Sequence, residues 1–187
     1  MRETKTVYFD GPGQDNTDTT FALARERAAE LGIRDIVIAS TAGETGAKAA
    51  RFFSGFRVVV VSHSTGFRRA NQQEMTPELR AEIESAGATV LTSLQPFGGI
   101  GRAIRMRFAT FTVEEVISNV LKLFGQGMKV VVEVTMMAAD AGLVQTGQEV
   151  LAVAGTDHGA DTAAVISAAN TLRIFDLRVR EIICKPR

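Results

Sequence analysis

Apolar runs alternate with helical patterns along almost the whole chain. Runs rich in valine and isoleucine predict strands, because a strand buried on both faces is continuously apolar. Apolar residues spaced three or four apart predict amphipathic helices between these runs. We expect strands at 6–9, 35–40, 57–64, 88–92, 129–135, 149–155, 162–168 and 177–184. We expect helices at 18–31, from the loop at 40–46 to about 53, at 76–86 and at 113–124, and a short helical turn at 136–142.

The order of these elements predicts the fold class. Strands separated by helices imply mainly parallel pairing, because a parallel neighbour requires a crossover connection. The segments within 149–184 have no long helix between them and should pair antiparallel. The prediction is therefore an α/β fold: a three-layer α/β/α sandwich with a mixed, mainly parallel sheet. Its 187 residues should form a single domain, 1–187, because they include no linker or repeat and suffice for a core.

Composition narrows the classes of partner. Lys+Arg and Asp+Glu both number 21, and this balance argues against nucleic acid, whose binding domains are usually basic. No stretch approaches the roughly 20 apolar residues of a membrane span, so no membrane partner is expected. The first residues include no apolar segment of signal-peptide length. One cysteine, Cys184, cannot form an internal disulfide, and we expect an inert buried thiol in a cytoplasmic protein.

The loop after the second expected strand has the composition of a phosphate-binding loop. Two glycines allow close approach of the backbone to a ligand, and three hydroxyls can donate hydrogen bonds. The N–H groups of the following helix start favour an anion. The loop includes no Lys or Arg, so backbone dipoles would hold the anion; the alternative is a plain capped turn. Its residues are Ser40, Thr41, Ala42, Gly43, Glu44, Thr45 and Gly46.

The order strand, [ST]-x-[SA]-G-x-[ST], helix resembles the C-terminal domain of pyruvate kinase. The segment 147–168 is similar to that domain's late strand, glycine-rich loop and strand. Further motifs resemble a small group of stand-alone proteins, without an assigned reaction, that are built on this domain. These motifs are YFDGPGQDNT, SHSTGF (62–67), MAADAG (137–142), GADTAAVI (159–166) and EIICKPR (181–187). The resemblance covers nearly the whole chain.

The resemblance implies a phosphorylated small molecule bound at the first loop and at the late glycine loop. The stand-alone group is associated with flavin mononucleotide (FMN), which is therefore the leading cofactor, and family analogy implies a homo-oligomer. Pyruvate kinases usually have tryptophan and arginine at the start of the late loop, where they help to hold the second phosphate of fructose bisphosphate. This chain has GTDH at 155–158 and no tryptophan, which favours a ligand with one phosphate. Nothing matches the catalytic domain of the kinase, so pyruvate kinase activity is not implied.

Residues after the third expected strand are further candidates for ligand binding. His63 could contact a flavin ring or a phosphate, or transfer protons. Thr65 and Gly66 suit close approach of a ligand, and Phe67 could stack on a planar ring. The alternatives are a histidine bonded to nearby backbone and a phenylalanine that only fills space.

The late loop offers a second group of candidates. His158 and Gly159 lie in its centre, and the two histidines of the chain are 95 positions apart, so no metal site is expected. Binding of a ligand hydroxyl or phosphate is the preferred interpretation. The candidates are Gly155, His158, Gly159, Asp161 and Thr162.

Two other segments carry weaker candidates. Glu133 interrupts an expected central strand, either as an acid/base group or as the partner of an arginine. Thr135 and Met136 follow it, where a flavin ring could rest, although methionine is more often core filler. The glycine- and proline-rich segment 93–111 is either a flap, with Arg102, Arg105 or Arg107 clamping a phosphate, or a solvated mobile loop.

The sequence therefore predicts a ligand class better than a reaction. It has no P-loop, HExxH or GxSxG motif, and no evident set of nucleophile, base and acid. One hypothesis is a flavin-dependent oxidoreductase, in which the cofactor supplies the chemistry. The other is a non-catalytic sensor or regulatory protein that binds a sugar phosphate or another phosphometabolite. Whether the protein is an enzyme stays open at this point.

Overall fold

The structure is a computed structural model that describes Met1 and residues 3–187. Helices and strands alternate through most of the chain, as the hydrophobic pattern predicts. The strands are β1 (Val7–Phe9), β2 (Asp35–Ala39), β3 (Arg57–His63), β4 (Thr89–Ser93), β5 (Glu149–Ala154), β6 (Thr162–Ser167) and β7 (Arg178–Pro186). The helices are α1 (Thr17–Leu31), α2 (Glu44–Phe52), α3 (Pro77–Ser85), α4 (Ile100–Phe108), α5 (Val113–Lys122) and α6 (Gln126–Asp140), with short 3-10 turns η1 (Gln14–Asn16) and η2 (Thr171–Asp176).

The described residues form one seven-stranded sheet in the order β1-β7-β6-β5-β2-β3-β4. β2 pairs parallel with β3 and β5, β3 with β4, and β1 with β7. β6 pairs antiparallel with both β5 and β7. The prediction of a mixed, mainly parallel sheet with antiparallel late segments is confirmed, because the connections that flank β6 include no crossover helix.

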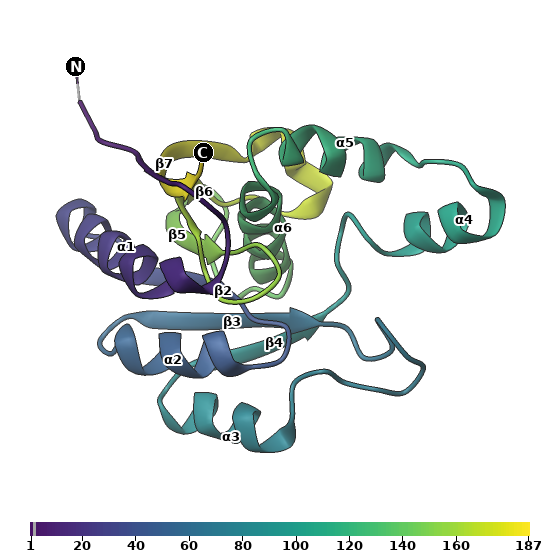
Figure 1. The fold of residues 1–187 in the computed structure, drawn as a ribbon, viewed down its shortest axis with the longest axis horizontal. Helices are drawn as coiled ribbons and strands as arrows, with labels where there is room; N and C mark the ends of the chain where they lie inside the picture. The colour runs from purple at the N-terminus through teal and green to yellow at the C-terminus, as the bar shows by residue number, and fades with distance from the viewer. Residues whose placement is uncertain (2) are drawn as a thin grey trace.

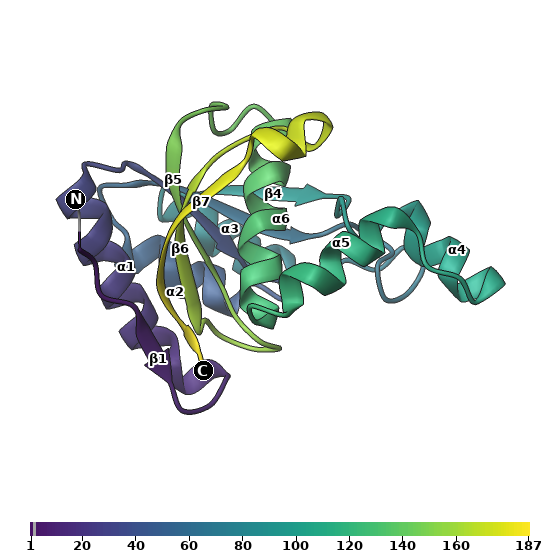
Figure 2. The same ribbon diagram turned by 90° about the horizontal axis from the view of Figure 1, so that it is seen from above.

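Two hydrophobic clusters lie on opposite faces of the sheet. Alternation along β2 separates them, since Ile36 and Ile38 belong to one cluster and Val37 to the other. Helices α1, α2 and α3 cover the first face, whereas α6, supported by α5, covers the second (Figures 1 and 2). This arrangement confirms the three-layer α/β/α sandwich.

The expected strand at 129–135 is wrong, because these residues lie inside α6. The helix continues without a break through the expected short turn at 136–142 as far as Asp140. It is buried along most of its length between the sheet and α5, so its β-branched residues show no polar face that would reveal helical periodicity. Tertiary packing here overrides the strand propensity of valine.

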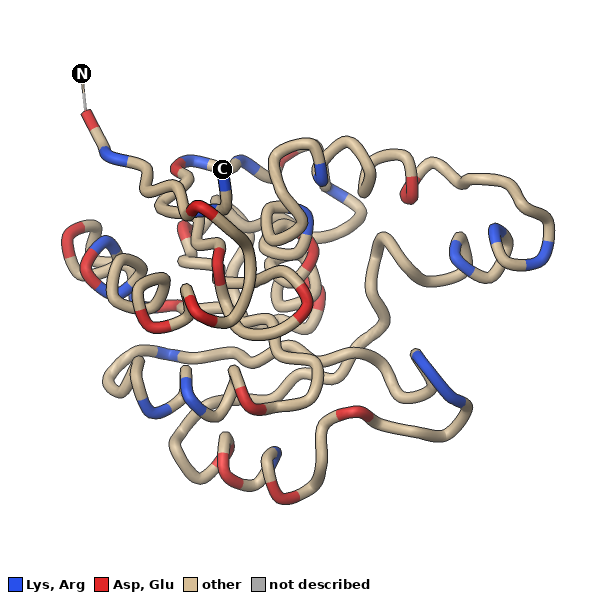
Figure 3. Tube along the Cα trace, in the orientation of Figure 1, with Lys and Arg blue, Asp and Glu red and all other residues tan. Residues whose placement is uncertain are grey.

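The segment 93–111 includes a helix, α4 (Ile100–Phe108), and is not a loop throughout. Helix α4 projects beyond the α/β body, and its main neighbour is α5 (Figures 1 and 2). The blue positions on α4 in Figure 3 mark a basic segment at the edge of the molecule. Across the described chain, every helix is too short or too polar to cross a membrane.

Candidate functional site

A cavity of about 700 Å³ opens at the carboxyl ends of β2, β3 and β5. The loops that follow these strands form one side of it, and α4, α5 and α6 form the other. Ligands of α/β proteins bind beyond the carboxyl ends of strands, and small-molecule sites usually measure about 300–1,000 Å³. The cavity therefore has the location and the size of a site for a small molecule.

Most of the residues expected to bind a ligand line this cavity. They are Ser40, Thr41, Ala42, Glu44, Thr45, His63, Phe67, Arg102, Gly155, His158 and Gly159. The structure does not bring the remaining candidates to its wall. These are Gly43, Gly46, Thr65, Gly66, Thr135, Met136, Asp161 and Thr162.

Thr135 and Met136 lie elsewhere because the strand that was to present them is a helix. Both side chains are fully buried in α6. The Thr135 hydroxyl donates a hydrogen bond of 2.7 Å to the carbonyl oxygen of Val131, one turn earlier in the helix. The expectation that a flavin ring rests at these two residues is therefore corrected: they are part of the core.

The loop between β2 and α2 exposes a helix N-terminus to the cavity. The N-cap residue of α2 is Gly43, with φ of 114°, and it has no side chain that could cap the helix. Ser40 Oγ accepts the N–H of Gly46 at 2.9 Å. No side chain in the described part of the chain accepts the N–H groups of Glu44 or Thr45. The first turn of α2 therefore offers free donors and the positive end of a helix dipole to an anion.

The glycines of this loop serve packing as much as ligand approach. A Cβ atom on Gly43 would lie 2.9 Å from Cβ of Leu79, on α3. A Cβ atom on Gly46 would lie 2.6 Å from a methyl group of Val60, on β3. Both distances are shorter than real Cβ contacts, so glycine holds α2 close to its neighbours and thereby positions the helix start.

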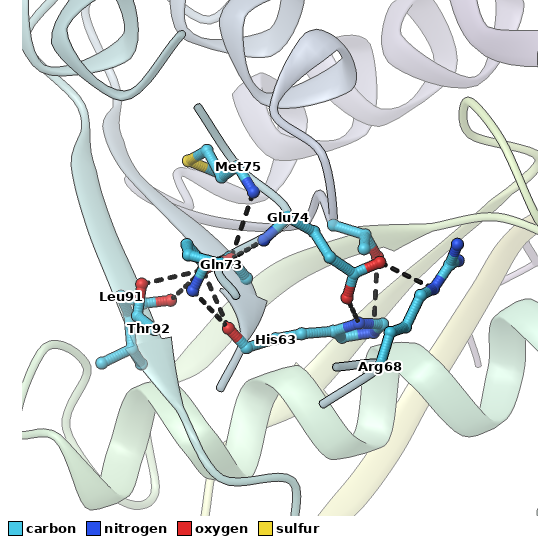
Figure 4. Close-up of polar contacts among 9 residues, drawn as sticks. His63, Arg68, Gln73, Glu74, Met75, Leu91 and Thr92 are labelled. Atoms are coloured by element: carbon cyan, nitrogen blue, oxygen red, sulfur yellow. Dashed lines mark hydrogen bonds and ion pairs between the residues drawn. The ribbon is translucent and has the colours of Figure 1, made fainter. Parts of the chain in front are cut away.

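His63 is the centre of a hydrogen-bonded cluster at the end of β3 (Figure 4). Its Nδ1 atom lies 2.7 Å from Oε2 of Glu74, and its Nε2 atom lies 3.3 Å from Oγ1 of Thr41. The other carboxylate oxygen of Glu74 lies 2.8 Å from Nε of Arg68. The ring nitrogens of His63 therefore contact side chains rather than nearby backbone.

Gln73 holds the loop that carries Glu74 (Figure 4). Its amide nitrogen donates to the carbonyl oxygen of His63 at 2.9 Å. Its side-chain oxygen accepts the N–H groups of Glu74 at 2.7 Å and of Met75 at 3.1 Å. These bonds fix the carboxylate beside the imidazole.

The order hydroxyl, imidazole, carboxylate in Thr41, His63 and Glu74 has a defined chemical capacity. A neutral imidazole can accept a proton from a hydroxyl at Nε2 while the carboxylate orients the ring through Nδ1. A protonated imidazole in the same place presents a positive N–H to an anion. The sequence offered no sign of this set, because the three residues lie on three separate segments.

An aromatic and cationic stack stands next to this cluster. The rings of His63 and Phe67 have centroids 4.1 Å apart with planes tilted by 42°. The guanidinium carbon of Arg102, on α4, lies 4.5 Å from the centre of the Phe67 ring. The stack joins the β3–α3 loop to α4 and places two aromatic rings and a guanidinium group at the cavity wall.

The opposite wall carries paired charges. Glu133 of α6 is 1% exposed, forms an ion pair with Lys129, and accepts the N–H of Phe97 at 3.1 Å. Oε1 of Glu115 lies 2.6 Å from Nε of Arg105, whereas its buried Oε2 has no partner in the described part of the chain. The partner of Glu133 is thus a lysine and not the arginine expected from the sequence.

Asp161 and Thr162 stabilise the late loop by hydrogen bonds and do not line the cavity. The carboxylate of Asp161 is fully buried and accepts the N–H groups of Gly13 at 3.1 Å and of Thr156 at 3.0 Å. It also accepts the hydroxyl of Thr162 at 2.7 Å. These bonds connect the late loop to Gly13, in the segment that precedes α1, so Asp161 and Thr162 stabilise the loop next to the cavity.

The described residues include no group of three or more His, Cys, Asp or Glu arranged to hold a metal ion.

Several residues that line the cavity were not among the candidates expected from the sequence. Glu74 follows His63 by 11 positions in an irregular loop, and no periodicity connects the two. Lys129 and Glu133 have the i, i+4 spacing of a helical ion pair, and this signal was readable only with a helix at that place. Lys122 and Glu115 lie on an expected helix, but nothing in the sequence indicates which face meets the cavity.

Solved structures similar to the chain include a pyruvate kinase from Cryptosporidium parvum, with 16% identity over 82% of this chain and 23% of that one (TM-score 0.41). A second similar structure is a Cryptosporidium parvum pyruvate kinase in complex with ADP, with 16% identity over 82% of this chain and 24% of that one (TM-score 0.42). A third is an O-ureido-L-serine synthase, with 18% identity over 76% of this chain and 51% of that one (TM-score 0.32). The chain spans about a quarter of the length of these pyruvate kinases. Residues 18–175 match the family model of the pyruvate kinase alpha/beta domain, and the chain therefore belongs to this family.

Proposed function

We propose that the cavity binds a phosphorylated small molecule, with its phosphate against the start of α2. The observation that carries this proposal is the pair of free N–H groups, of Glu44 and Thr45, in the first turn of α2, which lines the cavity beside the hydroxyls of Thr41 and Thr45. Free N–H groups and a helix dipole favour a phosphate there. His63 lies within 3.3 Å of Thr41 and adds a donor when it is protonated.

FMN is the leading ligand, because the cavity also offers a surface for a flat ring. The stack of His63, Phe67 and Arg102 supplies aromatic and guanidinium faces close to the proposed phosphate position. When bound, FMN supplies redox chemistry that no side chain of this protein provides. The chain itself would bind the phosphate, orient the ring and hold a proton at Nε2 of His63, as in a flavin-dependent oxidoreductase.

The alternative is a sensor or regulatory protein that binds a sugar phosphate or another phosphometabolite without catalysis. The wall of paired charges supports it, because Glu133, Lys129, Glu115 and Arg105 offer donors and acceptors for hydroxyl groups. A ligand with several hydroxyls and one phosphate would use both sides of the cavity.

We also propose a cytoplasmic location, because the sequence includes a single cysteine and so cannot form an internal disulfide.

The first experiment is a visible absorption spectrum of the freshly purified protein, with mass spectrometry of what heat releases. A flavin spectrum and the mass of FMN are the expected result. For a colourless preparation, FMN and sugar phosphates are added in turn and the melting temperature is followed. Stabilisation by a sugar phosphate alone would select the sensor alternative, and stabilisation by none of them would overturn phosphate binding.

A pair of variants tests the position of the phosphate. Thr41→Val together with Thr45→Val removes two hydroxyls at the start of α2 and keeps the side-chain volume close to that of threonine. We expect the affinity for FMN to fall at least ten-fold, because each hydroxyl lost from a phosphate contributes about 1–2 kcal/mol. Thr89→Val, at an exposed position of β4, is the matched control. Equal affinity in the folded double variant would move the phosphate elsewhere.

A further inference from the structure

Helix α5 presents a stripe of apolar residues outward, in addition to the apolar residues that it packs against the core as an ordinary surface helix does. Glu115 and Ser118 are buried against the cavity. Val113, Val116, Val120 and Leu123 are 74%, 51%, 52% and 82% exposed, and their spacing of three, four and three residues places them in one stripe. The core does not account for this stripe, because other residues of α5 pack against it.

Helix α4 and the connection to α5 extend this apolar area. Ile100, Met106 and Phe108 of α4 are each at least 70% exposed. Phe111 lies in the connection and lines a groove of about 330 Å³ together with Val116, Val120 and Leu123. We call these exposed residues the α4–α5 surface: Ile100, Met106, Phe108, Phe111, Val113, Val116, Val120, Leu123 and Phe124.

The area of the α4–α5 surface matches what one protein partner buries. These large side chains, each more than half exposed, present roughly 900 Å² of apolar area. A standard protein–protein interface buries about 800 Å² on each partner, whereas monomers rarely expose a patch of more than a few hundred Å². The surface therefore approaches the area that one partner of a dimer buries. Most of it comes from the α5 stripe with Phe111 and Phe124, because Met106 and Phe108, two residues apart, face different sides of α4.

The charges at its edge are complementary under two-fold symmetry. Helix α4 carries Arg102, Arg105 and Arg107 and no acidic residue, and α5 begins with Glu114 (Figure 3). Within the described residues, Arg107 and Glu114 have no ion-pair partner. A symmetric interface uses the same patch on both copies, so the basic helix of one copy can meet the acidic helix start of the other.

We propose that the α4–α5 surface pairs with the same surface of a second copy, so that the protein is a two-fold homodimer. The pairing also reaches the ligand cavity. Arg102 and Arg105 of α4 line that cavity, and Phe111 lines both the cavity and the apolar groove. Helix α4 packs mainly on α5, so a second copy would hold it, and with it one wall of the cavity, in place. This last consequence rests on the proposed function, whereas the dimer does not.

Analytical ultracentrifugation of the full chain, without ligand, tests the dimer. We expect twice the chain mass of 20.1 kDa at micromolar concentration. Val120→Asp together with Leu123→Asp should give a monomer with an unchanged far-ultraviolet circular dichroism spectrum, since both side chains are exposed. Leu172→Asp, at a position 99% exposed on η2, is the matched control and should stay dimeric. A monomeric wild type at 100 µM, or a double variant that stays dimeric, would overturn the proposal.

A charge exchange tests the orientation of the two copies. Arg107→Glu and Glu114→Arg should each raise the dimer dissociation constant several-fold, and their combination should restore it. Additive weakening in the combined variant would exclude a contact between Arg107 and Glu114 across the interface, and with it the charge complementarity argued above. Sedimentation of wild-type monomer with vesicles of phosphatidylcholine and phosphatidylserine would assign the surface to a membrane instead.

The effect on ligand binding is measured separately. If the dimer forms, the monomeric Val120→Asp/Leu123→Asp variant should bind FMN more weakly than wild type, because one wall of the cavity loses its support. Failure of FMN to bind wild type would count against the proposed function alone, since the dimer is measured without it. Equal FMN affinity in monomer and dimer would overturn the link between the two.

Discussion

The Nδ1 atom of His63 lies 2.7 Å from Oε2 of Glu74, so a carboxylate orients the imidazole whose other nitrogen faces Thr41 and the cavity. The pair joins the end of β3 to the irregular loop before α3. Through this contact, the geometry of the candidate site depends on residues that are remote in sequence from the loop at 40–46.

Replacement of Glu74 by glutamine should weaken ligand binding without loss of the fold. Glutamine keeps the shape of the side chain but removes the negative charge 2.7 Å from Nδ1 of His63. Because a charge-assisted hydrogen bond is about twice as strong as a neutral one, we expect about a five-fold to ten-fold lower affinity for FMN. Isothermal titration calorimetry measures it, with Glu78→Gln on the exposed side of α3 as control. Equal affinities in all three proteins would remove Glu74 from the binding site.

Three glycine variants separate backbone strain from crowding. Gly46→Ala should lower the free energy of unfolding by about 1–3 kcal/mol, because its Cβ would lie 2.6 Å from Val60. Gly55 has φ of 91° and open space around it, so Gly55→Ala should cost only about 1–2 kcal/mol of backbone strain. Gly43 combines a φ of 114° with a contact of 2.9 Å to Leu79, and Gly43→Ala should be the most destabilising. Urea denaturation measures all three, and an order in which Gly55→Ala costs most would contradict this reading.

The ion pair between Lys129 and Glu133 should be costly to break from one side. Lys129→Met leaves a carboxylate that is 1% exposed without its cation, and we expect a loss of about 3–5 kcal/mol in the free energy of unfolding at pH 7. Adding Glu133→Gln should recover most of this loss, because an amide oxygen can still accept the N–H of Phe97.

The matched control for this pair is Lys48→Met. Lys48 pairs with Asp18 on the protein surface, where an ion pair contributes about 1 kcal/mol or less. Chemical denaturation of the wild type and the three variants tests the comparison. Similar losses for Lys129→Met and Lys48→Met would show that burial of Glu133 carries no penalty.

Cys184 should be unreactive at neutral pH and should make stability depend on pH in the alkaline range. Burial raises the pKa of its thiol to about 11. The unfolded thiol ionises first as the pH rises above about 9, so the stabilising contribution is full below that pH and is lost towards pH 11. The expected loss is about 2 kcal/mol, relative to Cys184→Ala over the same range. A thiol reagent that labels the native protein rapidly at pH 7.5 would contradict the buried state of this side chain.

The sequence by itself determined the elements whose chemistry is local. The valine run of β3, the glycine-rich turn before α2, and the late loop between β5 and β6 could all be predicted, because burial on two faces and free helix-start amides leave direct marks in composition. These apolar runs and loop compositions were enough to predict the three-layer sandwich and to identify the loops at the carboxyl ends of the strands.

Only the tertiary structure decided which residues face one another. The run 129–135 forms part of a helix because α6 is buried between the sheet and α5, and burial on both sides removes the periodicity by which a helix is recognised. The same packing places Thr135 and Met136 in the core and brings Lys129 and Glu133 to the cavity. His63 meets Glu74 and Thr41 only because three loops converge at one edge of the sheet, and contacts between distant segments leave no local pattern along a chain.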